Sequence, residues 1–252
     1  MHTVVHLEDE RGTELEVEAD WAEIQADYDD LVSSYGALAV PGFRPGRAPG
    51  QQVERHFRKE IRADVVSRCV ERLSRQAIEA EKLNPVGPVS VSDVELEPGR
   101  PFRFLVRFTS APEFDIPDLA TLVLPDGTDA ERRDAASVWL LENTDTNVPD
   151  AVVEWELSFQ DDPSATPGSA EWDAARDRAK LLMILRAIAR RDGVDIDDRD
   201  VDKRIETMAG NVGTTARQLR NELLQKGGLR RVRTFMLAES TLDYLLETSG
   251  GL

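Results

Sequence analysis

Three Pro-Gly pairs, spaced four residues apart between Pro41 and Gly50, constrain the fold of this chain more than any other feature. Each proline fixes its own φ angle and lacks a backbone donor, and each glycine permits φ angles that other residues avoid. Neither a helix nor a central strand tolerates these residues at this spacing. Residues 41–50 are therefore predicted to form an ordered or semi-rigid loop.

The residues ahead of this loop predict a β-hairpin and a helix. Apolar residues alternate with polar ones around Val5 and again around Val17, where the second face is acidic. A turn signal at 9–12 separates the two runs. Asp20 is then an N-cap candidate for a helix that continues to about Tyr35.

Helical periodicity resumes after the loop and then changes to strand periodicity. Apolar spacing predicts one helix or a pair of helices from 51 to about 83, where Asn84-Pro85 is a stop signal. Alternation at 89–96 and at 102–108 predicts two further strands. The order β-β-α-loop-α-β-β predicts an α+β domain over 1–115, in which helices cover one face of an antiparallel sheet.

The remaining chain divides into a mixed segment and a helical region. Six prolines punctuate residues 111–170, and we interpret residues 116–147 within this segment as a linker. Residues 148–252 are predicted to form an all-α domain. Its helix over 169–191 is apolar nearly all round at 181–185, which indicates a central, buried position. Further helices are predicted at 128–142, at 149–160, from Asp197 or Asp198 to about Met208, from a Thr214 cap to Gly227-Gly228, and at 229–248.

Composition favours a cytoplasmic protein with a local basic patch. The formal net charge is −17, and the single cysteine excludes a disulfide framework within one chain. No apolar run approaches a membrane span and no secretion signal is visible, so we expect no membrane contact. Six arginines and lysines gather against two glutamates over 41–62. An anionic partner would therefore meet the chain at this segment.

Residue types that carry catalysis or bind metals are sparse. His2 and His6 lie on the first strand without enough further ligands for zinc. Cys69 falls in an apolar helical stripe, where a small buried hydrophobe is favoured over a nucleophile. The aspartates over 195–202 lack the glycine and the distant glutamate of a calcium loop, so capping and solvation explain them better. With no nucleotide-binding motif, we expect no enzyme activity, no metal and no cofactor.

The loop itself carries the strongest binding signal. Its prolines and glycines leave little conformational freedom to lose on binding, and they would hold Phe43 and Arg44 away from the body. An aromatic ring beside a guanidinium group is a typical binding hot spot. Two plainer interpretations stay open: the arginines form a solvated surface, and Phe43 folds back onto the sheet.

At this loop the chain resembles a known family. The run from Gly42 to Pro49 is similar to the G-F-R-x-G-x-x-P signature of bacterial trigger factor, the ribosome-associated chaperone. The acidic hairpin before it resembles the ribosome-binding domain of that family, as do the strand at 102–108 and Pro112-Glu113-Phe114 after it. The C-terminal part, with Asn147-Val148-Pro149-Asp150, is similar to the family's helical, substrate-cradling domain.

The resemblance implies an ATP-independent chaperone that holds unfolded or nascent polypeptides. It implies docking at the tunnel exit of the large ribosomal subunit, on protein and on rRNA phosphate. The implied ribosome-binding residues are Gly42, Phe43, Arg44, Pro45, Gly46 and Arg47, supported by a basic face with Arg55 and Arg58. Candidate client-binding residues are Met183, Met208, Phe235 and Met236, for which a place in the helical core is the alternative. Whether two copies pair as a homodimer stays open.

Two departures from the family leave a second function open. Only about thirty residues separate Leu119 from Pro149, too few for the FKBP-type prolyl isomerase domain that the family usually carries between its other parts. Pro45 stands where the family commonly has a lysine, which removes one positive charge from the loop. The alternative is therefore an assembly or adaptor protein that keeps the chaperone fold for one dedicated partner away from the ribosome.

Overall fold

The computed structural model describes residues 1–9, 12–160, 163–225 and 228–249. It divides the chain into two compact units. Unit 1 comprises Met1–Pro85 and Val89–Ser110, and unit 2 comprises Val86–Pro88 and Ala111–Leu252. Neither unit, over the described residues, contains a helix that is both long and apolar enough to cross a membrane.

Unit 1 is built on a four-stranded sheet with the order β1-β2-β4-β3. Its strands are β1 (His2–Asp9), β2 (Gly12–Ala19), β3 (Pro85–Glu95) and β4 (Phe102–Ser110). The hairpin pairs β1 with β2, and β2 also pairs with β4, both in antiparallel fashion. The register places Val17 opposite Phe104, so alternate residues of both strands face the same side.

The two faces of this sheet differ in chemistry. On the inner face, Leu15, Val17 and Ala19 of β2 are fully buried, as are the phenylalanines of β4. On the outer face, the Arg103 guanidinium donates to the Glu18 carboxylate at 2.7 Å. The outward glutamates of β2, which the sequence predicts as an acidic face, are thus partly neutralised by cross-strand arginines.

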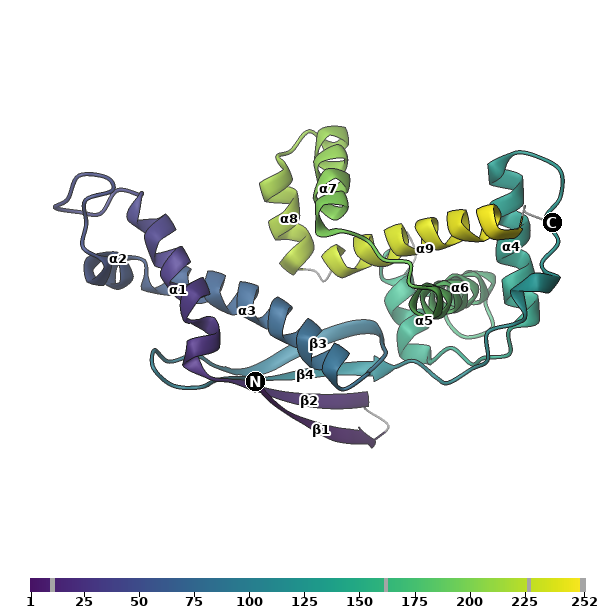
Figure 1. Ribbon diagram of the computed structural model, residues 1–252, viewed down its shortest axis with the longest axis horizontal. Coiled ribbons are helices and arrows are strands. Elements are labelled where there is room, and N and C mark those ends of the chain that lie inside the picture. The colour runs from purple at the N-terminus through teal and green to yellow at the C-terminus, as the bar shows by residue number, and fades with distance from the viewer. Residues whose placement is uncertain (10–11, 161–162, 226–227, 250–252) are drawn as a thin grey trace. The chain divides into compact units, whose positions relative to one another are not determined.

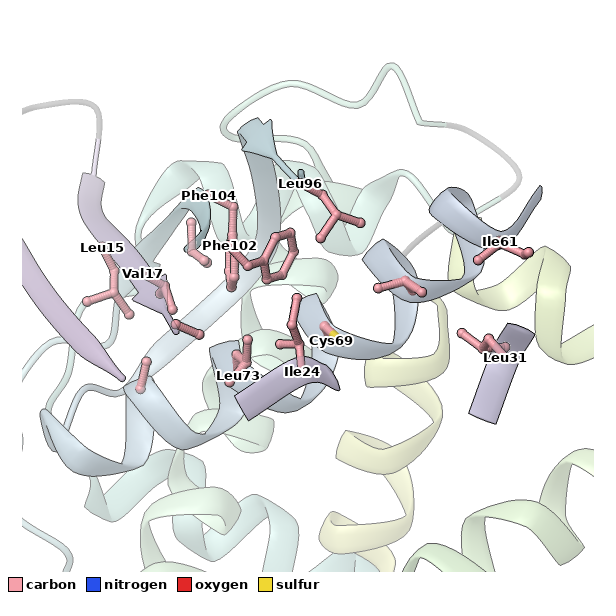
Figure 2. Close-up of a cluster of buried hydrophobic side chains, with 14 of the residues drawn as sticks. Leu15, Val17, Ile24, Leu31, Ile61, Cys69, Leu73, Leu96, Phe102 and Phe104 are labelled. Atoms are coloured by element: carbon pink, nitrogen blue, oxygen red, sulfur yellow. The ribbon is translucent and has the colours of Figure 1, made fainter. Parts of the chain in front are cut away.

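Helix α3 (Arg58–Ala80) lies along the inner face of the sheet, and two further helices of unit 1, α1 (Trp21–Gly36) and α2 (Gly50–His56), pack against it (Figure 1). Helix α1 begins with a capping box between Asp20 and Glu23, as the N-cap signal predicts. The buried positions of α3 recur every fourth residue, which turns one stripe toward the sheet. Figure 2 shows the resulting core, where Ile24 of α1, Leu73 of α3 and Phe102 of β4 converge.

Unit 2 is mostly helical. Its described elements are the 3-10 turn η1 (Leu119–Thr121) and the helices α4 (Asp129–Asn143), α5 (Asp150–Leu157), α6 (Ala170–Asp192), α7 (Asp198–Val212), α8 (Ala216–Gln225) and α9 (Gly228–Ser249). Helix α6 supplies buried residues to two apolar clusters, which confirms the central position predicted from its 181–185 run. Helix α9 contacts α4 and α6, and its N-terminal half lies beside α7 and α8 (Figure 1).

The fold confirms the predicted class, an α+β region followed by a helical region, with three local corrections. Helix α7 continues past Met208 to Val212, because Gly213 provides the left-handed C-cap with φ 70°. The hydroxyl that accepts from the Gln218 backbone belongs to Thr215, not Thr214. Strand β3 begins at Pro85 and contains Pro88, which an edge strand tolerates. The predicted turn residues 10 and 11, and Gly227, lie outside the described residues.

Candidate functional site

Two of the Pro-Gly pairs form successive turns in the loop of residues 41–50, hereafter the Pro-Gly loop. The Phe43 amide donates to the Val40 carbonyl at 3.0 Å, and the Arg47 amide donates to the Arg44 carbonyl at 3.0 Å. Each turn has proline second and glycine third, with φ of 85° at Gly42 and 76° at Gly46. This is the residue pattern that type II turns require. The third pair, at 49–50, leads into α2.

The loop is anchored on both sides. The Gly46 amide donates to the carbonyl of Gly36, the last residue of α1, at 3.1 Å. Val40 is buried at one end of the loop, and Ala48 packs against the unit 1 core at the other. Below the loop, the Tyr35 ring packs on Phe57 with centroids 5.2 Å apart. The sequence prediction of an ordered loop is therefore confirmed by specific backbone bonds and apolar anchors.

Between these anchors the side chains face solvent. Residues 41–47 are all exposed, and the Phe43 side chain, 41% exposed, lies outside the unit 1 core. Neither Arg44 nor Arg47 makes an ion pair with any carboxylate of the residues that the structure describes. Phe43 does not fold back onto the sheet, so one short loop exposes an apolar ring and two arginine side chains to solvent.

The arginines beyond the loop fall into two groups. Arg55 and Arg58, on α2 and at the start of α3, are exposed and extend the basic surface. Arg72, farther along α3, instead donates to the Asp27 carboxylate at 2.8 Å, with Arg68 at 3.8 Å from the same group. The arginines of α2 and α3 named here are thus divided between surface charge and an ion-pair clamp that joins α1 to α3.

The thiol of Cys69 lies inside this clamp. Burial raises the pKa of Cys69 to about 11, and the nearby Asp27 charge adds to the effect. A thiol held in its protonated form is a poor nucleophile, and the side chain is fully buried. The structure therefore confirms the interpretation of Cys69 as a core residue.

The candidate client-binding residues of unit 2 lie in different environments. Met183 is buried in a cluster with Trp172, and it also lines a pocket. Met236 packs half-buried against the cluster around Ile205, and Met208 is half-buried on α7. Phe235 lies half-buried under the Arg231 guanidinium, 4.7 Å from its ring centroid. They do not gather into one apolar surface, and their part in client binding stays a prediction.

The sequence did not predict one group of residues that lie together in unit 2. The pocket that Met183 lines, hereafter the arginine pocket, lies within unit 2 and carries the guanidinium groups of Arg186 and Arg230. At one side of it, Glu156 is 1% exposed and accepts from Arg231 at 2.7 Å. The signal in the sequence was the register, because Arg186 continues the buried face of α6 that holds Ala179 and Met183. A basic residue at a helix position that continues an apolar stripe therefore indicates a half-buried charge.

Among the residues that the structure describes, no group of three His, Cys, Asp or Glu side chains could hold a metal ion. His56 packs against Phe57 in an edge-on ring contact. In the aspartate-rich segment, Asp197 caps α7 by accepting from the Arg199 amide at 2.8 Å, which is the role that the sequence predicts there.

Comparison with known proteins agrees with these features. The family model described as bacterial trigger factor protein matches residues 1–135, and the model of the C-terminus of the same family matches residues 156–247. A trigger factor from Tolumonas auensis is 35% identical over 111 residues, which are 44% of this chain and 25% of that protein. A trigger factor from Solibacter usitatus is 30% identical over 112 residues, 44% of this chain and 26% of that protein.

These matches span about a quarter of the length of each relative. A solved chain from a study of "promiscuous substrate recognition in folding and assembly activities of the trigger factor chaperone" aligns over 98% of this chain and 99% of its own length, with 11% identity and a TM-score of 0.44. The N-terminal family match alone covers more than half of the 252 residues. The chain therefore belongs to the bacterial trigger factor family.

Proposed function

We propose that this protein is a cytoplasmic, ATP-independent chaperone that docks on the large ribosomal subunit through the Pro-Gly loop and holds unfolded or nascent chains. The observation that carries the docking part is the exposure of Phe43, Arg44 and Arg47 on a loop that backbone bonds hold in place. Little entropy is lost when such a preformed surface binds. Phe43 would fill an apolar spot on a ribosomal protein, and the arginines would meet carboxylates or rRNA phosphates.

Charge distribution supports docking at this loop rather than elsewhere. At a net charge of −17 the chain as a whole is repelled by RNA. The ion-pair-free arginines of the loop, together with Arg55 and Arg58, are a local exception within the described residues. Contacts with phosphate release counterions, so the binding should weaken as salt is raised.

We assign the two roles to different units. Unit 1, with the Pro-Gly loop, is the docking module, and unit 2 is the module that holds clients. The family matches to N- and C-terminal parts, with residues 136–155 between them, support this division. Residues 111–149 form only η1, α4 and their connections, which supports the further proposal that the chain has no prolyl isomerase activity.

The test of docking is co-sedimentation with purified ribosomes at low and high salt. We expect wild-type protein to pellet with ribosomes at low salt and less at high salt, and the Phe43→Ala, Arg44→Ala double variant to remain in solution. A matched control, Val91→Ala with Arg100→Ala, removes one exposed apolar side chain and one exposed arginine from another part of unit 1. This control should pellet like the wild type.

Two results would contradict docking through this loop. Pelleting of the Phe43→Ala, Arg44→Ala variant at wild-type levels would place the contact elsewhere. No pelleting of the wild type at any salt would favour the dedicated adaptor, for which a pull-down from lysate should then yield one stoichiometric folded partner. Client holding is tested separately, by suppression of light scattering when a denatured enzyme is diluted with and without ATP.

A further inference from the structure

The stretch of chain that precedes the Pro-Gly loop runs back alongside it. The Gly46 amide donates to the Gly36 carbonyl at 3.1 Å, and the Phe43 amide donates to the Val40 carbonyl at 3.0 Å. Two backbone hydrogen bonds therefore tie the end of α1 and the loop together at both ends of this stretch. Leu38 lies midway between Gly36 and Val40, so its backbone runs beside the loop.

The Leu38 side chain is large, apolar and not covered by unit 1. It is 49% exposed, more than the 41% of Phe43, and it lies outside the unit 1 core. Its backbone amide donates to the Tyr35 carbonyl at 3.0 Å, so the end of α1 holds it in place. Its neighbours Ala37 and Ala39 are exposed as well. A partner that covered Leu38 would gain apolar burial without first ordering a mobile segment.

A single exposed leucine is ordinary, but Leu38 has uncharged surroundings and a second exposed apolar residue close by. No residue from Leu31 to Phe43 is charged, although 31% of the residues of the whole chain are. Leu38 and Phe43 therefore belong to one short, bonded and uncharged stretch. The other large apolar side chains that unit 1 exposes, among the residues described, lie on strands or at the start of the chain: Met1, Val4 and Val91.

The charge pattern indicates which kind of partner fits this surface. A nucleic acid is bound mainly through its phosphates, by several cations. The stretch around Leu38 offers no cation, and Arg44 and Arg47 come only after Phe43. An apolar patch on a protein, with carboxylates beside it, matches both the uncharged part and the arginines. RNA would match the arginines alone.

We propose that Leu38 is a second apolar docking residue, which together with Phe43 covers an apolar patch on a ribosomal protein. This inference rests on the proposed docking through the Pro-Gly loop, and it adds a specificity-determining residue from outside that loop. Two apolar side chains on one ordered stretch select the shape of a partner more strictly than one ring does. Ions do not screen the burial of apolar surface, so the contribution of Leu38 should persist at high salt.

The test is a titration of the full chain, fluorescently labelled at its C-terminus, with purified ribosomes at low and high salt. Leu38→Ala should raise the Kd about tenfold at both salt concentrations, because the exposed half of a leucine side chain is no longer buried on binding. Arg44→Ala should raise the Kd mainly at low salt. The matched control Val91→Ala, at an exposed apolar position of β3, should leave the Kd unchanged.

A lysine at the same position distinguishes a protein patch from RNA. Leu38→Lys should weaken binding at least as much as Leu38→Ala, because it places a charge in an apolar contact. If RNA faced this position, Leu38→Lys would instead bind more tightly than the wild type, and its Kd would rise more steeply with salt. Since Leu38 is exposed, both variants should have the urea midpoint of the wild type, which checks that unit 1 is intact.

The outcomes separate this inference from the proposed function. An unchanged Kd for Leu38→Ala, while Phe43→Ala weakens binding, would overturn the second docking residue and leave docking through the loop in place. Tighter binding of Leu38→Lys would also overturn it, in favour of RNA. If the wild type bound no ribosomes at any salt, docking and the role of Leu38 would be refuted together. A tenfold loss shared by both salt concentrations, with the stability unchanged, would support the role of Leu38.

Discussion

Removal of Arg231 should destabilise unit 2 far more than removal of an equally well-formed ion pair on its surface. Glu156 is 1% exposed and its partner Arg231 is 16% exposed, whereas the second pair, Arg133 with Asp243, is 44% and 48% exposed. Both pairs join two helices of unit 2, with N–O distances of 2.7 Å and 2.5 Å. They therefore differ mainly in burial.

The expected magnitudes follow from this difference. Arg231→Ala leaves the Glu156 charge buried without its partner, which should lower the free energy of unfolding of unit 2 by about 3–5 kcal/mol. Loss of the guanidinium contact with Phe159 should add roughly 0.5–1 kcal/mol. Both members of the Arg133–Asp243 pair already face water, so Arg133→Ala should lower the free energy of unfolding by less than about 1 kcal/mol. Because the buried charges also cost solvation, Glu156→Leu combined with Arg231→Met should be closer to the wild type than Arg231→Ala is.

Urea denaturation followed by tryptophan fluorescence measures these changes. The chain has four tryptophans, and only Trp21 lies in unit 1. A Trp21→Phe background therefore reports on unit 2 alone, and linear extrapolation gives its free energy of unfolding. A cost below about 1 kcal/mol for Arg231→Ala, equal to that of Arg133→Ala, would refute the argument that burial makes the Glu156 pair important.

Two further predictions concern unit 1. Because the pKa of Cys69 is raised from 9.0 to about 11, its thiolate fraction near pH 8 should be about a hundredfold below that of a free thiol, and Asp27→Asn should raise its reaction rate with a thiol reagent. The stability that this protonated thiol contributes should be complete below about pH 9 and should decline as the pH rises toward 11. Between pH 9 and 11, the urea midpoint of the wild type should therefore fall faster with pH than that of Cys69→Ala. An equal fall for both proteins would contradict the raised pKa of Cys69. Gly12→Ala should lower the free energy of unfolding of unit 1 by at least about 2 kcal/mol, because φ is 105° and a Cβ would lie 2.6 Å from the Phe108 carbonyl oxygen. Gly99 has φ 78° and open space around it, so Gly99→Ala should show only the cost of its φ angle. Equal losses for the two glycine variants, measured from unit 1 unfolding, would show that the contact with Phe108 is unimportant.

Local signals were enough to predict the elements of unit 1 and the order of the loop. The capping pair Asp20 and Glu23, the fourfold spacing from Ile61 to Ala77 and the Pro-Gly repeat each act within a few residues, so they can be read directly from the sequence. The ends of helices were less predictable where two neighbouring residues could serve equally well as the cap. Thr214 and Thr215 are both good caps, and only the hydrogen bond from the Gln218 amide distinguishes them.

The arginine pocket could not be predicted because its parts are far apart in sequence. Glu156 and Arg231 are 75 residues apart, and no local pattern links them. The register of α6 marks Arg186 as half-buried, but nothing near it in the sequence indicates that Glu156 and Arg230 lie beside it until α5, α6 and α9 are packed together. The exposure of Phe43 depended in the same way on packing around the loop, since the turns alone allow the ring to point either way.

The strand order β1-β2-β4-β3 also determines when unit 1 can assemble during synthesis. Strands β1 and β2 leave the ribosome first, but the second neighbour of β2 is β4, and the Arg107–Glu14 contact between them spans 93 residues. Until β4 has been made, the apolar face of β2 with Leu15 and Val17 lacks the phenylalanines that cover it. Closing so long a loop is slow relative to local helix formation. The growing chain therefore carries an uncovered apolar strand until β4 has been made and has paired with β2.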